Sequence, residues 1–223
     1  MARGAGKIDR RALRRPDEFI TRSAKVIKYV QVNKKKVLLI VGGVLVVFVA
    51  VFAYRMYQGG QEARASSLVS MAIEGFGKYP TNSAPFERII HGYSGTRGAR
   101  LAGLYLAHSL HRKGEAERAA KAYQKLTEDS AAPELLRTEA ILGRGYAFVT
   151  LKRCKEAESA FKQTPAKAGL AQQQAQLAIG QCYELKGEPH EALKHFQEFA
   201  GRFPQSPLLT DALRRKIGMD KNK

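Results

Sequence analysis

The sequence has few of the residues on which metal sites and covalent catalysis depend. Its 223 residues include two cysteines, five histidines and no tryptophan. No CxxC, HExxH or GxxxxGK(S/T) motif occurs, which argues against a zinc module and a P-loop enzyme. No Ser/His/Asp or Cys/His arrangement stands out, and the histidines form no recognisable ligand set: His91, His108, His111, His190 and His195. We therefore expect no catalysis, no cofactor and no bound metal.

Acidic residues are scarce, and the positive charge is unevenly distributed. The chain has 38 Lys and Arg against 20 Asp and Glu, a net charge of +18. Residues 1–36 contain 12 basic and three acidic residues, whereas residues 37–54 contain no charged residue. The hydrophobic content of 44% is that of a folded protein rather than a disordered one.

The uncharged run at residues 37–54 is long enough to cross a membrane. Eighteen helical residues, rising about 1.5 Å each, span ~27 Å, close to the thickness of a hydrocarbon core. A cleaved signal peptide has a shorter apolar part of about 7–15 residues and a small-residue cleavage site. This run instead ends at Tyr54, and Arg55 follows it. We predict an uncleaved single-pass anchor.

The flanking charges predict the orientation of that anchor. Basic residues crowd its N-terminal side, so the positive-inside rule places residues 1–36 in the cytoplasm and residues 58–223 beyond the inner membrane, in the periplasm. Residues 16–30 have the pattern of an amphipathic helix that could lie on anionic lipid. A nucleic-acid-binding arm is the alternative, but topology already requires this charge, so we expect no nucleic acid.

Beyond residue 60 the apolar pattern is helical and the sequence repeats itself. No segment alternates apolar and polar residues as a half-buried strand would, so we predict an all-α fold. Three segments contain the same series of four positions: a small residue, an apolar or aromatic residue, an alanine and an aromatic residue. The second series lies 38 residues after the first, and the third lies 35 residues after the second. The three series are Ala107, Leu110, Ala119 and Tyr123; Gly145, Phe148, Ala157 and Phe161; and Gly180, Tyr183, Ala192 and Phe196.

These segments resemble tetratricopeptide repeats, which are helix–turn–helix units that stack into a solenoid. The resemblance implies about three helix pairs over residues 100–219, with Gly145 and Gly180 letting the first helix approach the second at Ala157 and Ala192. Gly114 and Gly187 then occupy interhelix turns, where the second repeat has Lys152. The position that is tryptophan-like in the family is held here by Gly103, Ile141 and Gln176.

The segments on either side of the repeats complete the predicted domain organisation. Residues 55–99 form a helical stalk and connector, with one helix over 61–78 and a short one over 84–91. A C-terminal capping helix is predicted with Ser206 as its N-cap, Pro207 at its first position and Gly218 as its terminator. Residues 220–223 are a tail.

Tetratricopeptide arrays generally bind protein segments in the groove lined by the first helix of each pair. Carried over by the resemblance, the groove positions are apolar or weakly polar and suit an apolar or extended partner, unless a neighbouring helix covers some of them. They are Leu104, His108, His111, Leu142, Tyr146, Val149, Leu177, Gln181 and Glu184.

The two cysteines lie on consecutive helices of this scheme. Cys154 opens the second helix of repeat 2 and Cys182 lies late in the first helix of repeat 3. Consecutive helices run antiparallel, so the two thiols either form a disulfide in an oxidising compartment or are buried separately as small apolar side chains.

The whole layout is similar to the ancillary subunit family of the Sec translocon. The similarity covers about residues 15–217 and rests on that layout and on RLAGLYLAHSLHRKGEAERAAKAYQKL (Arg100–Leu126). It implies association with the translocon and with a membrane-anchored periplasmic chaperone. The alternatives are a scaffold for outer-membrane assembly or cell division, whose repeats end like His195–Ala212, and a structural protein that assembles with itself into oligomers.

Overall fold

The computed structural model describes residues 27–219, and within that range every regular element is a helix. The chain divides into two compact units, residues 1–58 and residues 59–223. The predicted amphipathic segment lies mostly outside the described residues, and the predicted tail at 220–223 lies wholly outside them.

The described part of the first unit is helical and highly exposed. Residues 27–32 are helical, and α2 (Lys34–Lys78) contains the whole uncharged run of residues 37–54. The large apolar side chains from Leu38 to Phe52 are 52–76% exposed. Among the described helices, α2 alone has the length and composition to cross a membrane. The described part of the chain therefore has one helix, near its N-terminal end, that is long and apolar enough to cross a membrane.

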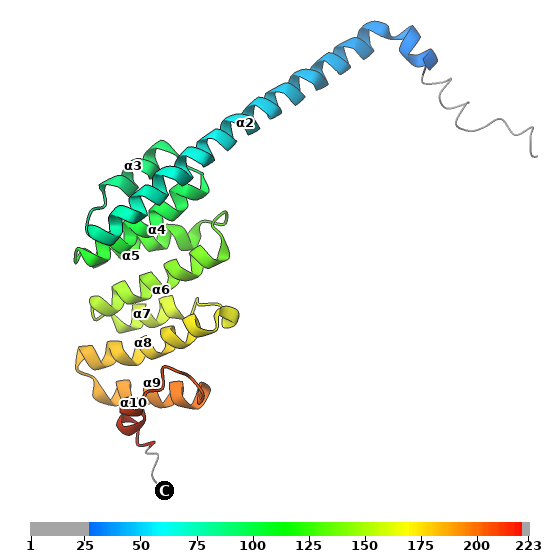
Figure 1. Cartoon of the computed structure of the whole chain (residues 1–223). Coiled ribbons are helices and arrows are strands. Elements are labelled where there is room, and N and C mark those ends of the chain that lie inside the picture. The colour runs from blue at the N-terminus through cyan, green and yellow to red at the C-terminus, as the bar shows by residue number, and fades with distance from the viewer. Residues whose placement is uncertain (1–26, 220–223) are drawn as a thin grey trace, which may run out of the picture. The chain divides into compact units, whose positions relative to one another are not determined.

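The second unit is a stack of antiparallel helices (Figure 1). After the end of α2 come α3 (Ala84–Gly92), α4 (Arg97–Arg112), α5 (Ala116–Glu128), α6 (Glu134–Thr150), α7 (Cys154–Phe161), the short η2 (Ala166–Ala168), α8 (Leu170–Lys186), α9 (Pro189–Arg202) and α10 (Asp211–Lys216). Each helix from α3 to α9 packs on the next, and α6 also packs on α4 and α8. This arrangement is the predicted all-α solenoid. The segment predicted as a helix at 61–78 is the last part of the continuous α2, and α3 corresponds to the helix predicted at 84–91.

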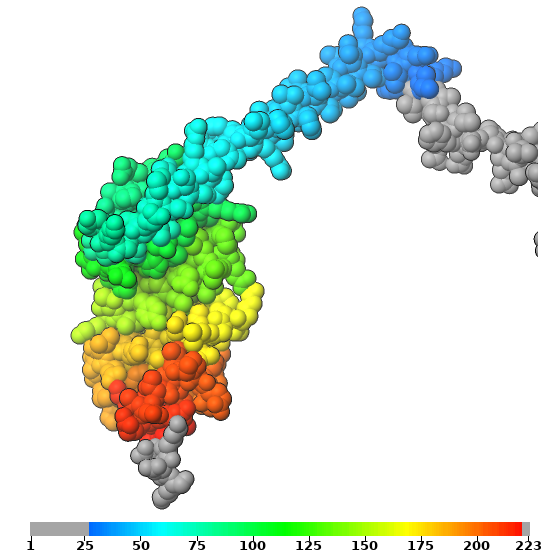
Figure 2. Space-filling view, in the orientation of Figure 1, coloured from blue at the N-terminus to red at the C-terminus, as the bar shows by residue number. Residues whose placement is uncertain are grey.

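The core runs through the stack as three neighbouring clusters. Phe86 and Val69 anchor the first, Tyr123 the second and Phe199 the third. Phe148 packs against both the second and the third cluster, so adjacent repeats share a core. One helix pair cannot bury its apolar face alone, and the shared core explains why the pairs stack. The space-filling view shows successive pairs in direct contact, in chain order (Figure 2).

Glycines permit the closest helix contacts, and each of these glycines faces an aromatic ring. A Cβ at Gly180 would lie 2.5 Å from Cε1 of Phe196, and one at Gly145 would overlap the ring of Phe161. Gly143 meets the ring of Tyr123 in the same way. The first helix of a pair therefore approaches an aromatic ring of its neighbour most closely, and Phe161 and Phe196 share one core cluster with the predicted contact residues Ala157 and Ala192.

The three interhelix turns have one backbone conformation. Gly114 and Gly187 both have φ of +86°, and Lys152 takes the equivalent place with φ of +56°. In each turn the next amide donates five residues back, from Glu115 to Leu110, from Arg153 to Phe148 and from Glu188 to Tyr183, all at 2.9 Å. This left-handed C-terminal cap favours glycine, so Lys152 is a non-glycine residue in a glycine conformation.

The capping helix begins later than predicted. Its N-cap is Thr210, whose Oγ1 accepts from the amide of Leu213 at 3.3 Å, so the prediction of Ser206 is wrong. Ser206 instead donates to Oε1 of Gln173 at 2.6 Å and accepts from the amide of Leu208 within a turn. That turn buries Leu209 before the helix begins. Gly218, with φ of +74°, ends the helix as predicted.

Candidate functional site

The predicted groove residues lie on α4, α6 and α8, but two of them are in the interior. Leu104 is 6% exposed and Leu142 is 5% exposed, and both belong to the core clusters. The prediction that they line an open groove is wrong. Both side chains belong to the core between adjacent helix pairs. A residue's position in the family pattern does not reveal this burial.

His108 is partly buried and packs against two tyrosine rings. Its ring lies edge to face with those of Tyr105 and Tyr123, with centroids 5.9 and 5.5 Å apart. Its Nδ1 lies 2.6 Å from the hydroxyl of Tyr123. Burial, followed by the nearby His111 and Arg112, lowers the pKa of His108, while burial raises the pKa of Tyr123. A neutral imidazole that accepts from the Tyr123 hydroxyl fits both shifts.

His111 connects two first helices of the stack. Its Nε2 lies 2.8 Å from Oγ1 of Thr150 on α6, and that hydroxyl donates to the carbonyl of Tyr146. Burial, then Arg112, lowers the pKa of His111. Among the described residues, no three His, Cys, Asp or Glu side chains converge as metal ligands. The contacts of His108 and His111 are packing and hydrogen bonding.

The remaining predicted groove residues leave a partly accessible face, and the chain's own C-terminus covers one end of it. Tyr146, Val149 and Leu177 are half-buried, whereas Gln181 and Glu184 are exposed. Glu184 forms an ion pair with Lys216 of α10, and Lys216 also lies over the ring of Phe196. A hollow of about 640 Å³ between α8 and α10 includes Leu177 and Gln181 in its lining. The groove expected on the third repeat is thus shared with the capping helix.

The structure joins Cys154 and Cys182 by a disulfide bond. Cys154 is the first residue of α7 and Cys182 lies on α8, with their Cα atoms 5.6 Å apart. Both residues are buried in the core cluster that the second and third repeats share. The bond therefore ties two neighbouring repeats to each other.

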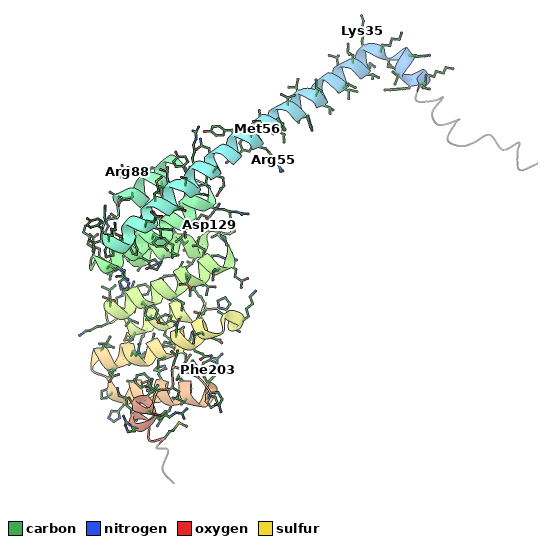
Figure 3. The ribbon with its side chains drawn as sticks, viewed as in Figure 1. Lys35, Arg55, Met56, Arg88, Asp129 and Phe203 are labelled. Carbon is green, nitrogen blue, oxygen red and sulfur yellow. A yellow bond between two sulfur atoms is a disulfide. The ribbon has the colours of Figure 1, made fainter. Side chains whose placement is uncertain are left out.

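An apolar groove between the end of α2 and α3 was not anticipated. It encloses about 470 Å³, and its lining includes Leu68, Met71, Phe76 and Tyr79. Met71 is 57% and Tyr79 67% exposed, although both are large apolar residues. Arg88 of α3 also borders this groove (Figure 3). The sequence contained a signal for this groove. The apolar residues of α2 occupy a second face of the helix in addition to the face that packs on α4.

A second unanticipated hollow, which we call the α4 notch, lies between α3 and α5 over α4. It encloses about 480 Å³. Leu106, Leu110 and Leu126 supply apolar lining, and Arg118, Lys121 and Lys125 of α5 supply positive charge. Asp129, which follows α5 (Figure 3), is held by Arg100 at 2.7 Å. The notch therefore combines an apolar floor with a basic rim.

Comparison with known proteins identifies a family. The sequence profile described as a tetratricopeptide repeat-like domain matches residues 28–217. No curated protein matches the chain. The matched segment covers most of the sequence and includes the apolar helix as well as all the repeats. The chain belongs to the tetratricopeptide repeat-like domain family.

Proposed function

We propose that this protein is a membrane-anchored scaffold that binds other proteins on the exported side of the inner membrane. One observation carries the proposal: the family match begins at residue 28 and ends at residue 217, so it joins the apolar helix and the repeats in one unit. Tetratricopeptide-like domains are typically non-catalytic scaffolds. An anchored array of this kind holds its partners at a membrane.

Two observations support placing the repeats in the periplasm. The N-terminal flank of the apolar run contains 12 basic residues within residues 1–36, which favours a cytoplasmic N-terminus. The disulfide between Cys154 and Cys182 is the kind of bond that persists outside the reducing cytoplasm. Charge and redox chemistry therefore favour the same orientation.

We further propose that the partners are the Sec translocon and a membrane-anchored periplasmic chaperone. This part rests on the resemblance of Arg100–Leu126 and of the overall layout to the ancillary translocon subunits. The apolar groove between α2 and α3 offers Met71 and Tyr79 to an apolar partner segment. The half-buried Tyr146, Val149 and Leu177 offer a second surface.

In-cell photocross-linking of the full chain tests the proposal. A photoreactive residue replaces Met71 in the α2–α3 groove, and the control replaces the exposed Lys194 on α9. Capture of a channel subunit and a periplasmic chaperone from position 71, but not from position 194, is the expected result. Capture of outer-membrane assembly or division proteins without the channel would overturn the translocon assignment, and capture of this chain alone would favour self-assembly. Absence of cross-links from position 71 would contradict the proposed docking surface.

A further inference from the structure

The α4 notch exists because one repeat lacks a side chain that the others have. Gly103 occupies the tryptophan-like position of the first repeat, where the second repeat has Ile141 and the third has Gln176. A Cβ at Gly103 would make an ordinary contact, 3.4 Å from Cδ2 of Leu126, with no closer neighbour. Space that a larger residue would fill therefore remains open over an apolar floor.

Two of the three basic residues at the rim have no carboxylate partner among the described residues, whereas Arg118 is paired with Glu115. Lys121 and Lys125 are exposed and lie one turn apart on α5, and neither forms an ion pair with any described residue. The carboxylate that borders the notch, Asp129, is engaged by Arg100 and by the amide of Ala131. The notch therefore presents two available ammonium groups beside apolar surface.

The equivalent position in the third repeat has different chemistry, which makes the first repeat distinctive. Seventy-three residues further along the chain, Gln176 lies in a hollow of about 370 Å³ between α7 and α9. Glu158 and Glu198 border that hollow together with Lys162 and Arg202, so charges of both signs meet there. The excess of positive charge over an apolar floor is a property of the α4 notch.

We propose that the α4 notch binds an acidic amphipathic segment of a partner protein. Apolar side chains of that segment rest on the partly exposed Leu106 and Ala122, with the buried Leu110 and Leu126 at the bottom of the notch, and its carboxylates pair with Lys121 and Lys125. Two basic residues at i and i+4 have Cβ atoms about 6 Å apart, which matches two carboxylates one helical turn apart. This inference rests on the proposed scaffold function and assigns the scaffold a partner-binding surface away from the α2–α3 groove.

Binding of a designed peptide to the full chain in detergent tests the inference. The probe is a fluorescent 14-residue helix of Glu and Leu with its leucines on one face, and the reference is a scrambled peptide of the same composition. We expect the amphipathic peptide to bind at least about tenfold more tightly, because a tenfold difference requires only about 1.4 kcal/mol. Equal binding of the two peptides would overturn the inference.

Three variants locate the binding surface. Lys121→Glu with Lys125→Glu should weaken binding about tenfold or more, with a smaller loss at high salt, because attraction becomes repulsion. Gly103→Leu fills the notch and should also weaken binding, whereas Gly103→Ala leaves most of it open and should bind as the wild type does. Lys194→Glu, at the position equivalent to Lys121 in the third repeat, is the charge control and should change affinity less than twofold.

An equal loss in the Lys194→Glu variant would mean that net charge, not the notch, governs binding, and would overturn the inference.

Two further outcomes separate this inference from the scaffold proposal. Partner cross-links from position 71 without any peptide binding would overturn it as well, while leaving the scaffold proposal standing. Peptide binding without partner cross-links would contradict the proposed cellular role and support the notch.

Discussion

The second repeat (α6 and α7) and the third repeat (α8 and α9) share their closest contact and differ in their turn. Gly145 meets Phe161 in one and Gly180 meets Phe196 in the other. The turn residue, however, is Lys152 in the second repeat and Gly187 in the third, both with positive φ. The buried contact tolerates no side chain, whereas the exposed turn keeps its shape with a residue that is merely less favourable. Interior packing therefore restricts the choice of residue in these repeats more strictly than backbone conformation does.

We expect the largest effect on stability when a side chain is introduced at this shared contact. Gly180→Ala places a Cβ against the ring of Phe196, and we expect a loss of about 3 kcal/mol in the free energy of unfolding, as for overpacked cores. Gly145→Ala should be similar, since its Cβ would overlap Phe161. Urea unfolding of the full chain in detergent measures this loss.

Gly201→Ala on α9 is the matched control, because nothing lies within 4 Å of a Cβ there. It should stabilise the protein by about 0.5–1 kcal/mol through helix propensity alone. Equal effects at positions 180 and 201 would contradict the packing argument.

The next effect concerns the covalent link between the two repeats. Reduction of the Cys154–Cys182 bond, whose sulfurs are separated by 28 residues of sequence, should lower the free energy of unfolding by roughly 3 kcal/mol. The expected cause is the greater conformational freedom of the unfolded chain. Thermal unfolding with and without reductant measures it, and the Cys154→Ala/Cys182→Ala variant should be insensitive to reductant. A reductant effect of the same size in that variant would refute the assignment.

Exchanging the turn residues should give smaller shifts of opposite sign. Lys152→Gly removes a side chain from a left-handed conformation and should stabilise the protein by about 1 kcal/mol. Gly187→Lys introduces the same conflict in the third repeat and should destabilise it by a similar amount. If both changes destabilise the protein, the side chain of Lys152 contributes a contact that outweighs its backbone cost.

The smallest expected effect on stability concerns the first repeat and depends on pH. His108 has Gln181 as its equivalent in the third repeat, and burial lowers the pKa of His108 in the folded state. The unfolded chain then binds a proton first, so stability is lost as the pH falls below about 6.5, the unfolded value. His108→Gln should remove this part of the acid sensitivity, measured as the difference between variant and wild-type unfolding from pH 7.5 to 5.5. Identical pH profiles would contradict a buried neutral histidine.

The repeats were predictable from sequence because their residues follow a helical period and recur after 38 and then 35 residues. The positions of Gly145, Phe161, Gly180 and Phe196 identified the helix pairs, and Gly187 identified a turn. The start of the capping helix was not predictable in the same way. Ser206 has a suitable side chain for an N-cap, but its hydroxyl is used by Gln173, 33 residues away in sequence. Local capping preferences do not include such distant partners.

The apolar helix, the helical repeats and their turns follow from the amino-acid sequence, because each depends on the order of neighbouring residues. Which surfaces remain accessible depends on how the helices pack. That packing buries Leu104 and Leu142, places Lys216 against Glu184, and leaves open the groove beside Met71 and the notch at Gly103. Accessibility depends on which helices meet, and those contacts join residues far apart in the chain, so a pattern along the sequence does not contain them.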